Sequence, residues 1–417
     1  MQPLQPARGT QDLLPEAARR HRLVSETARA VGELYGFAEI ATPIFEFTEV
    51  FARPIGETTD IVAKEMYTFK DRGGEDVTLR PENTAGVVRA VLSNGLIQST
   101  PLKFFYSGPM FRYERPQKGR FRQFHQIGVE LIGVAQAQGD IEVIALGSRI
   151  LDALGVRQRT VLELNTLGDP ASRAAYRDAL VSYFSAHASQ LSEDSLRRLD
   201  RNPLRIFDSK DDADQRISAE APPFAEYLNA ASRDFFSRVC DGLDRLGIGY
   251  SLNRRLVRGL DYYTHSAFEF VTAELGAQGT VMGGGRYDGL SESLDGPKAP
   301  GIGFAIGEDR LILALQSQGE TAVEKVQAYV APLGAGMNVH ALKLARELRR
   351  EGVSADIGDE AFRLKKSFEL AEKTGARFMV IVGENEVSAG QFAVKNLASG
   401  EQVQVPRAEL AKRLRSE

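Results

Sequence analysis

The chain has few of the residues that build disulfide frameworks or metal sites. It contains one cysteine, Cys240, and five histidines that lie far apart in the sequence. A single cysteine excludes an internal disulfide and any cysteine-based zinc site. None of the histidines belongs to a His-Glu-x-x-His pair, the spacing of many zinc proteases. The sequence therefore predicts a protein without a structural metal.

Long hydrophobic runs and a strong excess of one charge are also absent. No apolar run approaches the roughly 18 to 20 residues needed to span a bilayer. The N-terminal stretch MQPLQPARGTQDLLPE lacks the apolar segment of a secretory signal. The formal net charge of −4 gives the surface as a whole no attraction for nucleic acid. We therefore expect a cytoplasmic enzyme or binding protein, in which any nucleic-acid contact depends on a local concentration of basic residues.

The length of 417 residues predicts two or three domains rather than one core. Residues 15–36 have the periodicity of an amphipathic helix, and a strand with a bend at Pro43 is expected to follow in FAEIATPIFEF. A further helix is predicted at about 82–95. From about 168 to 240, long stretches of dense mixed charge indicate an inserted helical module, before strands and glycines return at 250–315.

The last part of the chain has a more regular pattern. The polar stretch QSQGETAVEK suits a linker. After it, strand and helix patterns alternate as β-α-β-α-β and end in a hairpin, with its turn near Ser399 and Gly400, and a final helix. The sequence therefore predicts a separate α/β domain at 325–417, of ordinary domain size.

Residues 104–133, FFYSGPMFRYERPQKGRFRQFHQIGVELIG, combine two strand patterns with a basic and aromatic loop. Its cations and rings are Arg112, Arg115, Lys118, Arg120, Arg122, Tyr113, Phe121 and Phe124. Such a mixture suits a ligand with phosphates to neutralise and bases to stack. The alternative is a solvated hairpin tip, where charged residues are common. We expect Arg112 and Glu114 on a strand that runs into the sheet, where unpaired charge is costly, and this favours a functional role.

Polar residues inside apolar runs indicate a pocket. Glu130 lies within IGVELIG, and glutamate is almost never buried without a partner. It either faces solvent at a strand end or binds a donor in a pocket. Gln126, four residues earlier, shares its face of the strand. Glu82 and Thr84, in TLRPENTAG, follow another strand, and they are also explained as N-terminal helix residues favoured by the helix dipole.

Two glycine-rich stretches, GGGRYDGL at 283–290 and PGIGFAIGEDRL at 300–311, lack the βαβ context of a dinucleotide-binding motif. Glycines within strands instead indicate that a ligand approaches the backbone closely. The second stretch opens a helix with Arg310 in its first turn, where a cation is unfavourable. Arg310 therefore indicates either an anion nearby or a pair with Asp309.

The stretch LVRGLDYYTHSAFEF divides into two halves. From Ala267 onward it alternates as a half-buried strand does. The first half carries polar residues that packing alone does not explain, namely Arg258, Gly259, Asp261, Tyr262 and Tyr263. Because a strand that only packs would not place a cation, a glycine and two phenols together, this half indicates that the group binds something.

These stretches occur in the order found in class II aminoacyl-tRNA synthetases, and the chain resembles the histidyl-tRNA synthetase family. FAEIATPIFEFTEVF is similar to motif 1 of the class, the dimer-forming helix and strand. MFRYERPQKGRFRQFHQIGVE is similar to motif 2, and GIGFAIGEDRL to motif 3. The specific marks are RGTQDLLP, TLRPENTAG, NPLRIFDSK and LVRGLDYYT. The resemblance covers essentially the whole chain.

The resemblance implies an α+β catalytic domain at 1–320, built on a mixed, mainly antiparallel sheet with a helical insertion at about 168–240. A C-terminal α/β anticodon-binding domain follows at 325–417. Members of the family activate L-histidine with ATP to histidyl-adenylate and pyrophosphate, and then transfer histidine to the 3′ end of histidine tRNA. The implied partners are therefore L-histidine, ATP with Mg²⁺, histidine tRNA and a second copy of the chain in a homodimer.

The resemblance also implies roles for individual residues. It makes the first half of LVRGLDYYTHSAFEF the wall of the substrate site, with Asp261 holding Arg258 or a neighbouring backbone group. Arg112 and Arg258 are the catalytic residues, which clamp the α-phosphate. Histidine is held by Glu82, Thr84, Arg112, Gln126, Glu130, Arg258, Tyr262 and Tyr263. ATP is held by Arg112, Glu114, Arg120, Phe124 and Arg310. Arg115 and Gln117 face the acceptor end of the tRNA, and no metal is bound by protein side chains alone.

Two residues depart from the family pattern. Asn83 stands where glycine is usual, and Asp309 stands where glutamate usually precedes the motif 3 arginine. The first departure alters the expected loop geometry near Glu82. Neither removes a group that the chemistry requires.

Two other interpretations remain open at this point. One is a catalytically inactive relative, similar to the regulatory subunit of an ATP phosphoribosyltransferase that senses histidine. Such chains usually lack the C-terminal domain and the arginine of the tyrosine motif, whereas this chain has both residues 325–417 and Arg258. The other is a plain nucleic-acid-binding module, which leaves Glu82, Gln126 and Glu130 unexplained.

Overall fold

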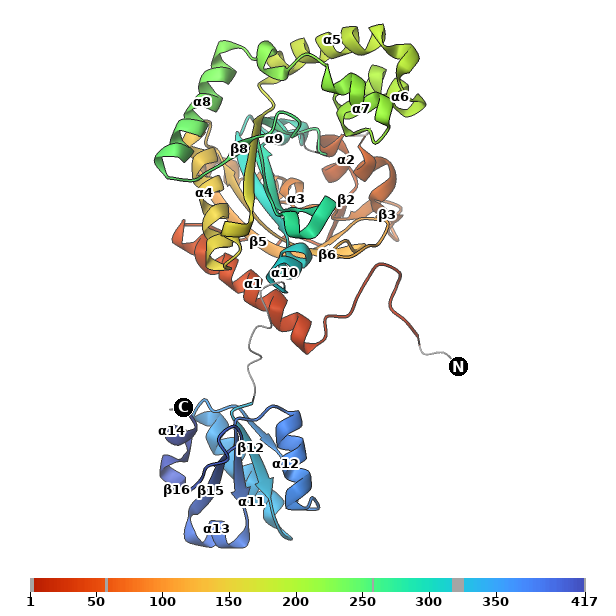
Figure 1. Cartoon of the computed structure of the whole chain (residues 1–417). Coiled ribbons are helices and arrows are strands. Elements are labelled where there is room, and N and C mark those ends of the chain that lie inside the picture. The colour runs from red at the N-terminus through yellow and green to blue at the C-terminus, as the bar shows by residue number, and fades with distance from the viewer. Residues whose placement is uncertain (1–3, 57–58, 257–258, 317–325, 416–417) are drawn as a thin grey trace. The chain divides into compact units, whose positions relative to one another are not determined.

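The computed structural model describes residues 4–56, 59–256, 259–316 and 326–415. The chain divides into two compact units, Met1–Gly319 and Glu320–Glu417, and each has a sheet and a core of its own (Figure 1). Most of the polar stretch expected to be a linker, QSQGETAVEK, falls outside the described residues. Among the described helices, none has the length and apolar character needed to cross a membrane.

The larger unit is built on a mixed, mainly antiparallel sheet. Among the described residues its strands follow the order β1-β5-β6-β11-β10-β9-β7-β8. Their bounds are Ala38–Glu39 (β1), Leu102–Phe111 (β5), Gln123–Ile132 (β6), Val161–Thr166 (β7), Ser251–Leu252 (β8), Thr264–Val271 (β9), Thr280–Arg286 (β10) and Gly301–Gly307 (β11). The outer pairs β1–β5 and β7–β8 are parallel and the inner pairs are antiparallel. The predicted fold class of this unit is confirmed.

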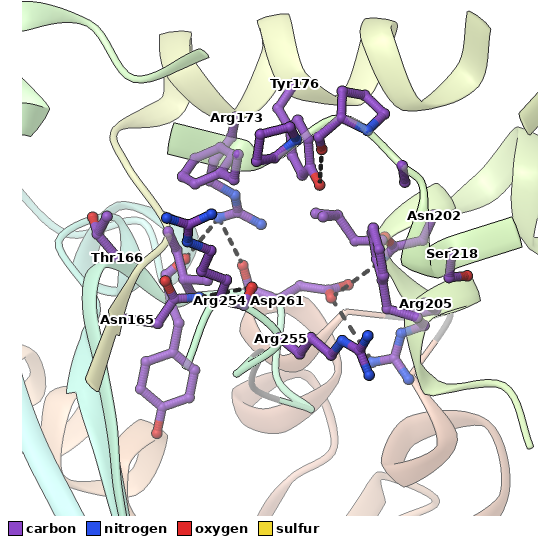
Figure 2. A pocket seen from close by; sticks show the side chains of 18 of the residues that line it. Asn165, Thr166, Arg173, Tyr176, Asn202, Arg205, Ser218, Arg254, Arg255 and Asp261 are labelled. Atoms are coloured by element: carbon purple, nitrogen blue, oxygen red, sulfur yellow. Dashed lines mark hydrogen bonds and ion pairs between the residues drawn. The ribbon is translucent and has the colours of Figure 1, made fainter. Parts of the chain in front are cut away.

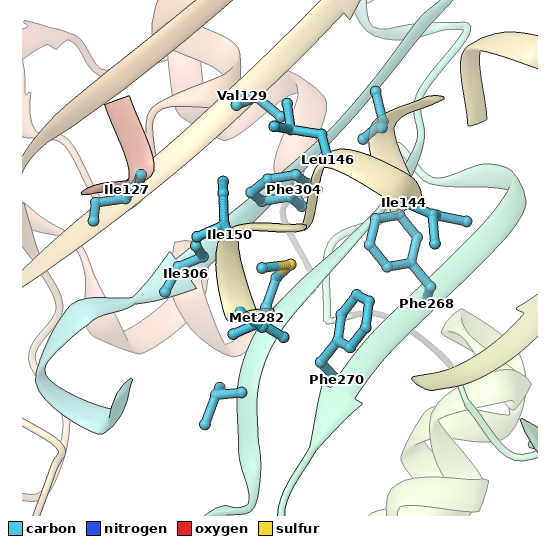
Figure 3. Close-up of a cluster of buried hydrophobic side chains, with 14 of the residues drawn as sticks. Ile127, Val129, Ile144, Leu146, Ile150, Phe268, Phe270, Met282, Phe304 and Ile306 are labelled. Carbon is cyan, nitrogen blue, oxygen red and sulfur yellow. The ribbon is translucent and has the colours of Figure 1, made fainter. Parts of the chain in front are cut away.

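One face of this sheet packs against a layer of helices. They are α1 (Pro15–Leu34), α4 (Ala137–Ala153), α8 (Ala230–Arg245) and α10 (Glu308–Gln316). Figure 3 shows Ile144 and Ile150 of α4 in one buried cluster with Phe268 of β9 and Phe304 of β11. Because strand residues alternate between faces, Val129 and its neighbours of like parity on β6 enter this core, and the residues between them face the other way.

The opposite face carries a second core and a small antiparallel sheet. Its helices are α2 (Glu49–Ile55), α3 (Thr84–Ser93) and α9 (Leu290–Ser293), and the small sheet has the order β2 (Phe45–Phe47), β4 (Asp76–Leu79), β3 (Tyr67–Lys70). The prediction of one continuous strand through FAEIATPIFEF is wrong, because β1 and β2 belong to different sheets. Pro43 lies between them, where its missing N–H cannot contribute to a ladder.

The insertion forms a body with its own apolar core. Its helices are α5 (Pro170–Ala186), α6 (Glu193–Arg201) and α7 (Asp212–Ala219), which lie together in the upper part of Figure 1. Tyr176, Leu180 and Phe184 of α5 form the centre of this core. The next helix, α8, instead packs with Val239 and Leu243 in the main core beside α4. Of the stretch expected at about 168–240, the part up to Tyr227 packs around the insertion's own core, whereas α8 belongs to the main core.

The smaller unit alternates strands and helices as the pattern predicts. Its sheet has the order β13-β12-β14-β15-β16, in which β12 is parallel to β13 and β14 and the remaining pairs are antiparallel. The strands are Ala328–Pro332 (β12), Ala355–Ile357 (β13), Phe378–Val382 (β14), Gln391–Asn396 (β15) and Gln402–Pro406 (β16). The helices are α11 (Met337–Arg350), α12 (Leu364–Lys373), α13 (Glu384–Ala389) and α14 (Leu410–Arg415). The short helix α13 was not foreseen, whereas the hairpin turn does contain Gly400 with a φ of 76°.

Candidate active site

The polar residues of β6 lie on the sheet face opposite the α4 layer. Gln126 and Glu130 alternate with apolar residues that enter the main core, so both point to the other side, as expected. In register, Glu130 lies between Phe104 of β5 and Gly303 of β11. Four residues of strand separate the two polar side chains by about 13 Å. This face of β6 therefore carries two polar side chains, one on each side of Gly128.

Glu130 is a buried carboxylate with partners on both oxygens. It is 1% exposed, so it is buried and does not lie at a solvated strand end. Thr84 Oγ1 donates to Oε1 at 2.7 Å, and Tyr287 Oη donates to Oε2 at 2.5 Å. Burial raises the pKa of Glu130 to about 8, against the opposing effect of the hydrogen bonds from Tyr287 and Thr84. The carboxyl group is therefore poised to change its charge near neutral pH.

Glu82 is buried beside the same cluster. Its oxygens accept the N–H groups of Thr84 at 2.7 Å and of Ala85 at 3.0 Å, in the first turn of α3. This agrees with the helix-end explanation. The carboxylate also lies 3.4 Å from Tyr262 Oη, a residue of the expected substrate wall. Burial raises the pKa of Glu82, and the two backbone hydrogen bonds oppose that rise.

The two tyrosines of the substrate wall are both buried. The rings of Tyr262 and Tyr263 lie 4.7 Å apart, and the ring of Tyr262 is 6.0 Å from that of Tyr287. The structure thus brings these rings together with Glu82, Thr84 and Glu130 in one cluster. Arg258, which the sequence places in this wall, lies outside the described residues.

The strand glycines make room for the side chains of this cluster. A Cβ atom on Gly303 would lie 2.0 Å from Glu130 Oε2, and one on Gly285 would lie 2.8 Å from the ring of Tyr263. The glycines were expected to let a ligand approach the backbone closely. Here the approaching groups are the chain's own carboxylate and phenol, so the glycines shape the pocket indirectly.

A cavity lies between the insertion and the stretch that contains Leu260, Asp261 and Tyr263 (Figure 2). It has a volume of about 250 Å³. Arg173, on α5, donates to the backbone oxygens of Tyr263 at 2.7 Å and of Asp261 at 3.4 Å. The Asp261 carboxylate lies 3.9 Å from Arg205, also of the insertion, and its N–H donates to the oxygen of Ile55. The insertion therefore supports the tyrosine wall from behind.

Another cavity, of about 260 Å³, is lined by Gln126 of β6. Arg112, Arg120 and Arg310 contribute cations to it, and Phe124 contributes a ring. Arg112 Nε donates to the oxygen of Pro81 at 2.8 Å, and its guanidinium lies 5.3 Å from the centre of the Phe124 ring. The cavity thus combines positive charge with an aromatic surface, the combination that suits a nucleotide.

Arg112 and Glu114 were expected on a strand, and this prediction is wrong. β5 ends at Phe111, so Arg112 and Glu114 lie just beyond it, although the Arg112 N–H still donates to the oxygen of Arg122 at 2.9 Å. Glu114 faces the cavity and forms an ion pair with Arg120 at 2.7 Å. A functional role for Arg112 and Glu114 is therefore supported by their place in the cavity wall and not by a strand position.

The tip of the basic loop is solvated. Arg115 and Gln117 are exposed, and Gln117 forms a tight backbone turn with Arg120. The interpretation of a solvated hairpin tip is therefore correct for these two residues. It fails for Arg112 and Phe124, which line the cavity.

Arg310 faces the cavity and not its neighbour in sequence. Its Nη1 donates to the oxygen of Thr280 at 3.3 Å. Burial lowers the pKa of Arg310, as does the positive charge of Arg120 and Arg112. The Asp309 carboxylate instead accepts the N–H of His125 at 3.0 Å. Of the two explanations for a cation at this helix start, a nearby anion is favoured.

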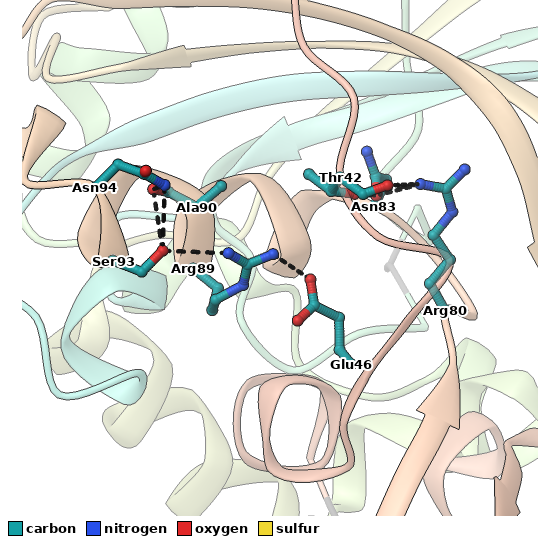
Figure 4. A network of polar contacts seen from close by, with 8 residues as sticks. All are labelled: Thr42, Glu46, Arg80, Asn83, Arg89, Ala90, Ser93 and Asn94. Carbon is teal, nitrogen blue, oxygen red and sulfur yellow. Dashed lines mark hydrogen bonds and ion pairs between the residues drawn. The ribbon is translucent and has the colours of Figure 1, made fainter.

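Asn83, one of the two departures from the family pattern, fits without strain. Its φ is −118°, which any residue adopts, so the position does not require glycine. Asn83 Oδ1 accepts from Thr42 Oγ1 at 2.6 Å and lies 3.4 Å from Arg80 Nη1 (Figure 4). The side chain thus ties the loop before α3 to the β1–β2 connection and leaves Glu82 in place.

Of two residues in this site, Tyr287 was not predicted from the sequence and Gln126 was. Tyr287 was missed, because GGGRYDGL attracts attention only to its glycines. Its position next to that glycine run was the available signal. Gln126 was foreseen, and its Oε1 is buried without a hydrogen bond to any described group. Such an orphan acceptor is costly unless a ligand supplies a donor.

Comparisons with known proteins agree with this geometry. A family model described as histidyl-tRNA synthetase matches residues 9–311, and one described as anticodon binding domain matches residues 327–417. The chain is 56% identical to a histidine–tRNA ligase of Rhodospirillum rubrum, over 96% of each chain. It is 52% identical to a histidine–tRNA ligase of Gluconobacter oxydans, over 99% of this chain and 98% of the relative. Among solved structures, an apo histidyl-tRNA synthetase of S. aureus superposes with a TM-score of 0.83 at 37% identity, over 99% of both chains.

Proposed function

The chain belongs to the histidyl-tRNA synthetase family, and from this premise we propose how its own residues carry out the reaction. ATP activates the carboxylate of L-histidine as histidyl-adenylate, pyrophosphate leaves, and the histidyl group then passes to the 3′ end of histidine tRNA. The observation that carries the proposal is the arrangement along β6. A cavity with Arg112 and Arg310 lies at one end, and the enclosed carboxylate of Glu130 lies at the other.

Glu130 and Tyr263 select the histidine side chain. A carboxylate offers about four lone-pair positions, and Thr84, Tyr287 and, at 3.4 Å, Tyr106 leave one of them for the substrate. The imidazole N–H takes that position, and Tyr263 serves the second ring nitrogen while Tyr262 lines the pocket. Side chains without two ring nitrogens leave these buried groups unpaired, which rejects such analogues by ~10⁴ or more.

Glu82, Thr84 and Gln126 orient the amino group and backbone of the substrate. An ammonium group needs acceptors, and the buried Glu82 carboxylate and the orphan Oε1 of Gln126 supply them. Because Gln126 also lines the nucleotide cavity, a histidine held here has its carboxylate directed toward the ATP. This placement is what turns two bound molecules into one reacting pair.

Arg112 and Arg258 clamp the α-phosphate during activation. The histidine carboxylate attacks the α-phosphorus in line, the bond to the bridging oxygen of the β-phosphate breaks, and pyrophosphate leaves with the electron pair. The chemistry needs positioning and charge neutralisation more than covalent participation by the protein. Arg112 is already fixed by its bond to Pro81, so it is preorganised for the charge that builds on the phosphate.

The remaining cavity residues hold the rest of ATP. Phe124 stacks on the adenine, Glu114 contacts its edge and is held by Arg120, and Arg310 binds the γ-phosphate. Mg²⁺ arriving with ATP would supply charge neutralisation that Arg310 alone does not provide. The described residues contain no group of three or more His, Cys, Asp or Glu side chains that could hold a metal by themselves. The carboxylates of Glu114 and Glu269 in the cavity suit an ion that arrives with ATP.

The tRNA contacts both units. The exposed Arg115 and Gln117 at the tip of the basic loop face the acceptor end. Residues 327–417, which match an anticodon-binding domain, bind the anticodon. The reaction takes place in the cytoplasm, where tRNA is charged.

A second copy of the chain covers the small sheet in a homodimer. Phe45 and Phe47 of β2 and Phe69 of β3 are 57%, 59% and 49% exposed. Phe47 and Phe69 both lie opposite Val77 of β4, so these rings form one row on one face. A contiguous exposed aromatic face of this kind marks an association surface, and twofold pairing of identical chains is the commonest solution.

One assay series tests the function. We expect the chain to catalyse histidine-dependent exchange of pyrophosphate into ATP and then to charge histidine tRNA. A chain ending at Gly319 should keep the exchange and lose most of the charging, because the smaller unit has its own core. Exchange without charging by the full chain would contradict the second step. Histidine binding without exchange indicates an inactive histidine sensor, and RNA binding without either indicates a plain nucleic-acid module.

A further inference from the structure

The first turn of α10 carries two buried carboxylates next to a histidine of α1. Glu308 and Asp309 are 2% and 8% exposed, and the side chain of His21 is 12% exposed. His21 Nδ1 lies 3.3 Å from Glu308 Oε1, and His21 Nε2 lies 3.8 Å from Asp309 Oδ1. One imidazole ring therefore faces both acids.

The two acids differ in their other partners. Asp309 accepts the backbone N–H of His125 at 3.0 Å and the Nε2 of Gln11 at 3.2 Å. Glu308 Oε1 and His21 Nδ1, in contrast, have no hydrogen bond to any other described group. A neutral His21 would leave two adjacent buried carboxylates with little to offset their charge, which is costly.

Other charged or titratable groups near the ring do not take over this role. His125 lies 5.1 Å away, ring centre to ring centre, and burial lowers the pKa of His125, which disfavours its charged form. The positive end of α10 favours the acids but amounts to only about half a charge. Arg20 and Glu16 of α1 pair with each other, and together with Lys118 they line the open cavity beside His21.

The cluster touches the nucleotide cavity from two sides. Arg310 follows Asp309 directly in α10, and Phe124 precedes His125 directly in β6. Both Arg310 and Phe124 line the cavity, and the bond from His125 N–H to Asp309 joins the two elements. Any shift at the start of α10 therefore moves the groups assigned to the γ-phosphate and the adenine.

We propose that His21 is a positioning residue for ATP: as an imidazolium it neutralises Glu308 and Asp309 and so holds the start of α10 against the end of β6. The inference rests on the proposed function in taking ATP as the ligand of this cavity. It assigns no contact between His21 and any substrate. ATP binding should therefore depend on the charge of His21.

The direction of the pH dependence follows from the surroundings of the ring. Burial lowers the pKa of His21, but the contacts with Glu308 and Asp309 outweigh it, so the pKa is raised above its ordinary value. The stabilising charge is therefore fully present below about pH 6.5 and is lost as the pH rises through the raised pKa. Because His21 borders an open cavity, solvent protons reach it.

Exchange kinetics of the full chain test the proposal. In His21→Gln, the KM for ATP relative to wild type should be raised about fivefold or more at pH 6.5, and this ratio should fall toward one at high pH. Taking the ratio cancels the titration of ATP itself. The KM for histidine should change less than about twofold, because the histidine cluster lies elsewhere. His340→Gln, in the smaller unit, is the matched control and should leave the ratio at one throughout.

A charge-compensating variant separates positioning from packing. His21→Gln combined with Glu308→Gln should return the KM for ATP to within about twofold of wild type, with no pH-dependent ratio. Carbon-13 NMR of the protein with labelled histidine side chains should show that the pKa of His21 lies above its ordinary value. The substitution Glu308→Gln should lower that pKa. A pH-independent ratio for His21→Gln, no rescue by the double variant, or a pKa of His21 at or below the ordinary value would each overturn the proposal. If wild type shows no exchange at all, the proposed function fails, whereas the pKa from NMR still decides the role of His21.

Discussion

Tyr287 Oη lies 2.5 Å from Glu130 Oε2, although 157 residues separate the two along the chain. The bond fixes one oxygen of the carboxylate, and Thr84 fixes the other. Glu130 is therefore held in one orientation before any substrate arrives. Its environment also places its change of charge near neutral pH, and both properties lead to measurable consequences.

Glu130→Gln should abolish histidine selection without unfolding the protein. The pKa of Glu130 is about 8, so the carboxyl group is largely protonated at pH 7 in the free protein, and an amide replaces it at little cost. Loss of the acceptor for the imidazole should lower kcat/KM for histidine in the exchange reaction by about 10²–10³. Calorimetry at pH 7 should show a melting temperature at or above that of wild type, since the variant has no buried carboxyl group to ionise. Glu163→Gln, on β7, is the matched control, and an unaltered exchange rate in Glu130→Gln would remove Glu130 from the site.

Tyr287→Phe should move the pH dependence of histidine binding upward. The hydroxyl stabilises the ionised carboxylate, so its removal raises the pKa of Glu130 further above about 8. The KM for histidine relative to wild type should therefore be highest below about pH 8 and should fall toward one as the pH rises above it. Parallel KM profiles for the two proteins would contradict the assignment.

The same carboxyl group should affect stability in a predictable direction. Between about pH 4.5 and 8 the folded chain retains a proton on Glu130 that the unfolded chain has lost. The contribution of Glu130 to the free energy of unfolding therefore decreases as the pH rises through this window. Denaturation of wild type and Glu130→Gln at several pH values should show the variant gaining stability relative to wild type over this range.

Arg112 and Arg310 should have separable kinetic effects. Arg112 is assigned to the α-phosphate, where charge develops in the transition state, so Arg112→Gln should lower kcat for exchange by about 10²–10³. Arg310 is assigned to the γ-phosphate, which is bound in the ground state, so Arg310→Gln should mainly raise the KM for ATP, by about tenfold. Arg238→Gln, on the exposed side of α8, provides the control. Equal effects of both variants on kcat and KM would argue against distinct phosphate contacts.

Phe47→Asp should convert the dimer into a monomer. The ring belongs to the exposed aromatic row of the small sheet, and a charge in the centre of such an interface is strongly unfavourable. Sedimentation velocity should show a dimer for wild type and a monomer for the variant. Leu246→Asp, an exposed apolar position after α8, should stay dimeric. A monomeric wild type would show that the aromatic face serves another partner.

The main elements of the fold could be predicted because their signals are local. The amphipathic period of α1, the β-α-β-α-β series of the smaller unit and the two long strands around the basic loop are all periodic over short stretches. The division of FAEIATPIFEF between two sheets was not visible, since each part alone has an ordinary strand pattern. The packing of α8 in the main core was hidden for a similar reason, because a charged amphipathic helix does not reveal which core it joins.

The site was predictable where one stretch carried several unusual residues. Gln126 and Glu130 stood out because a polar side chain recurs on one strand face, and the structure does place them on one face. Tyr287 and His21 did not stand out, because a single tyrosine or histidine is ordinary until its distant partner is known. Their partners, Glu130 and Glu308, lie far away in sequence. Only the folded chain brings such pairs together.

Gly303 limits how the specificity of this protein can be redesigned. The place of its missing side chain is already filled by the carboxylate of Glu130, which would lie 2.0 Å from any added Cβ. Substitution at Gly303 therefore cannot reshape this cluster without damage, because even alanine would displace the carboxylate that we assign to substrate recognition. A variant that accepts a different amino acid has to be sought among the tyrosines on the other wall, where side chains can be shortened without a collision.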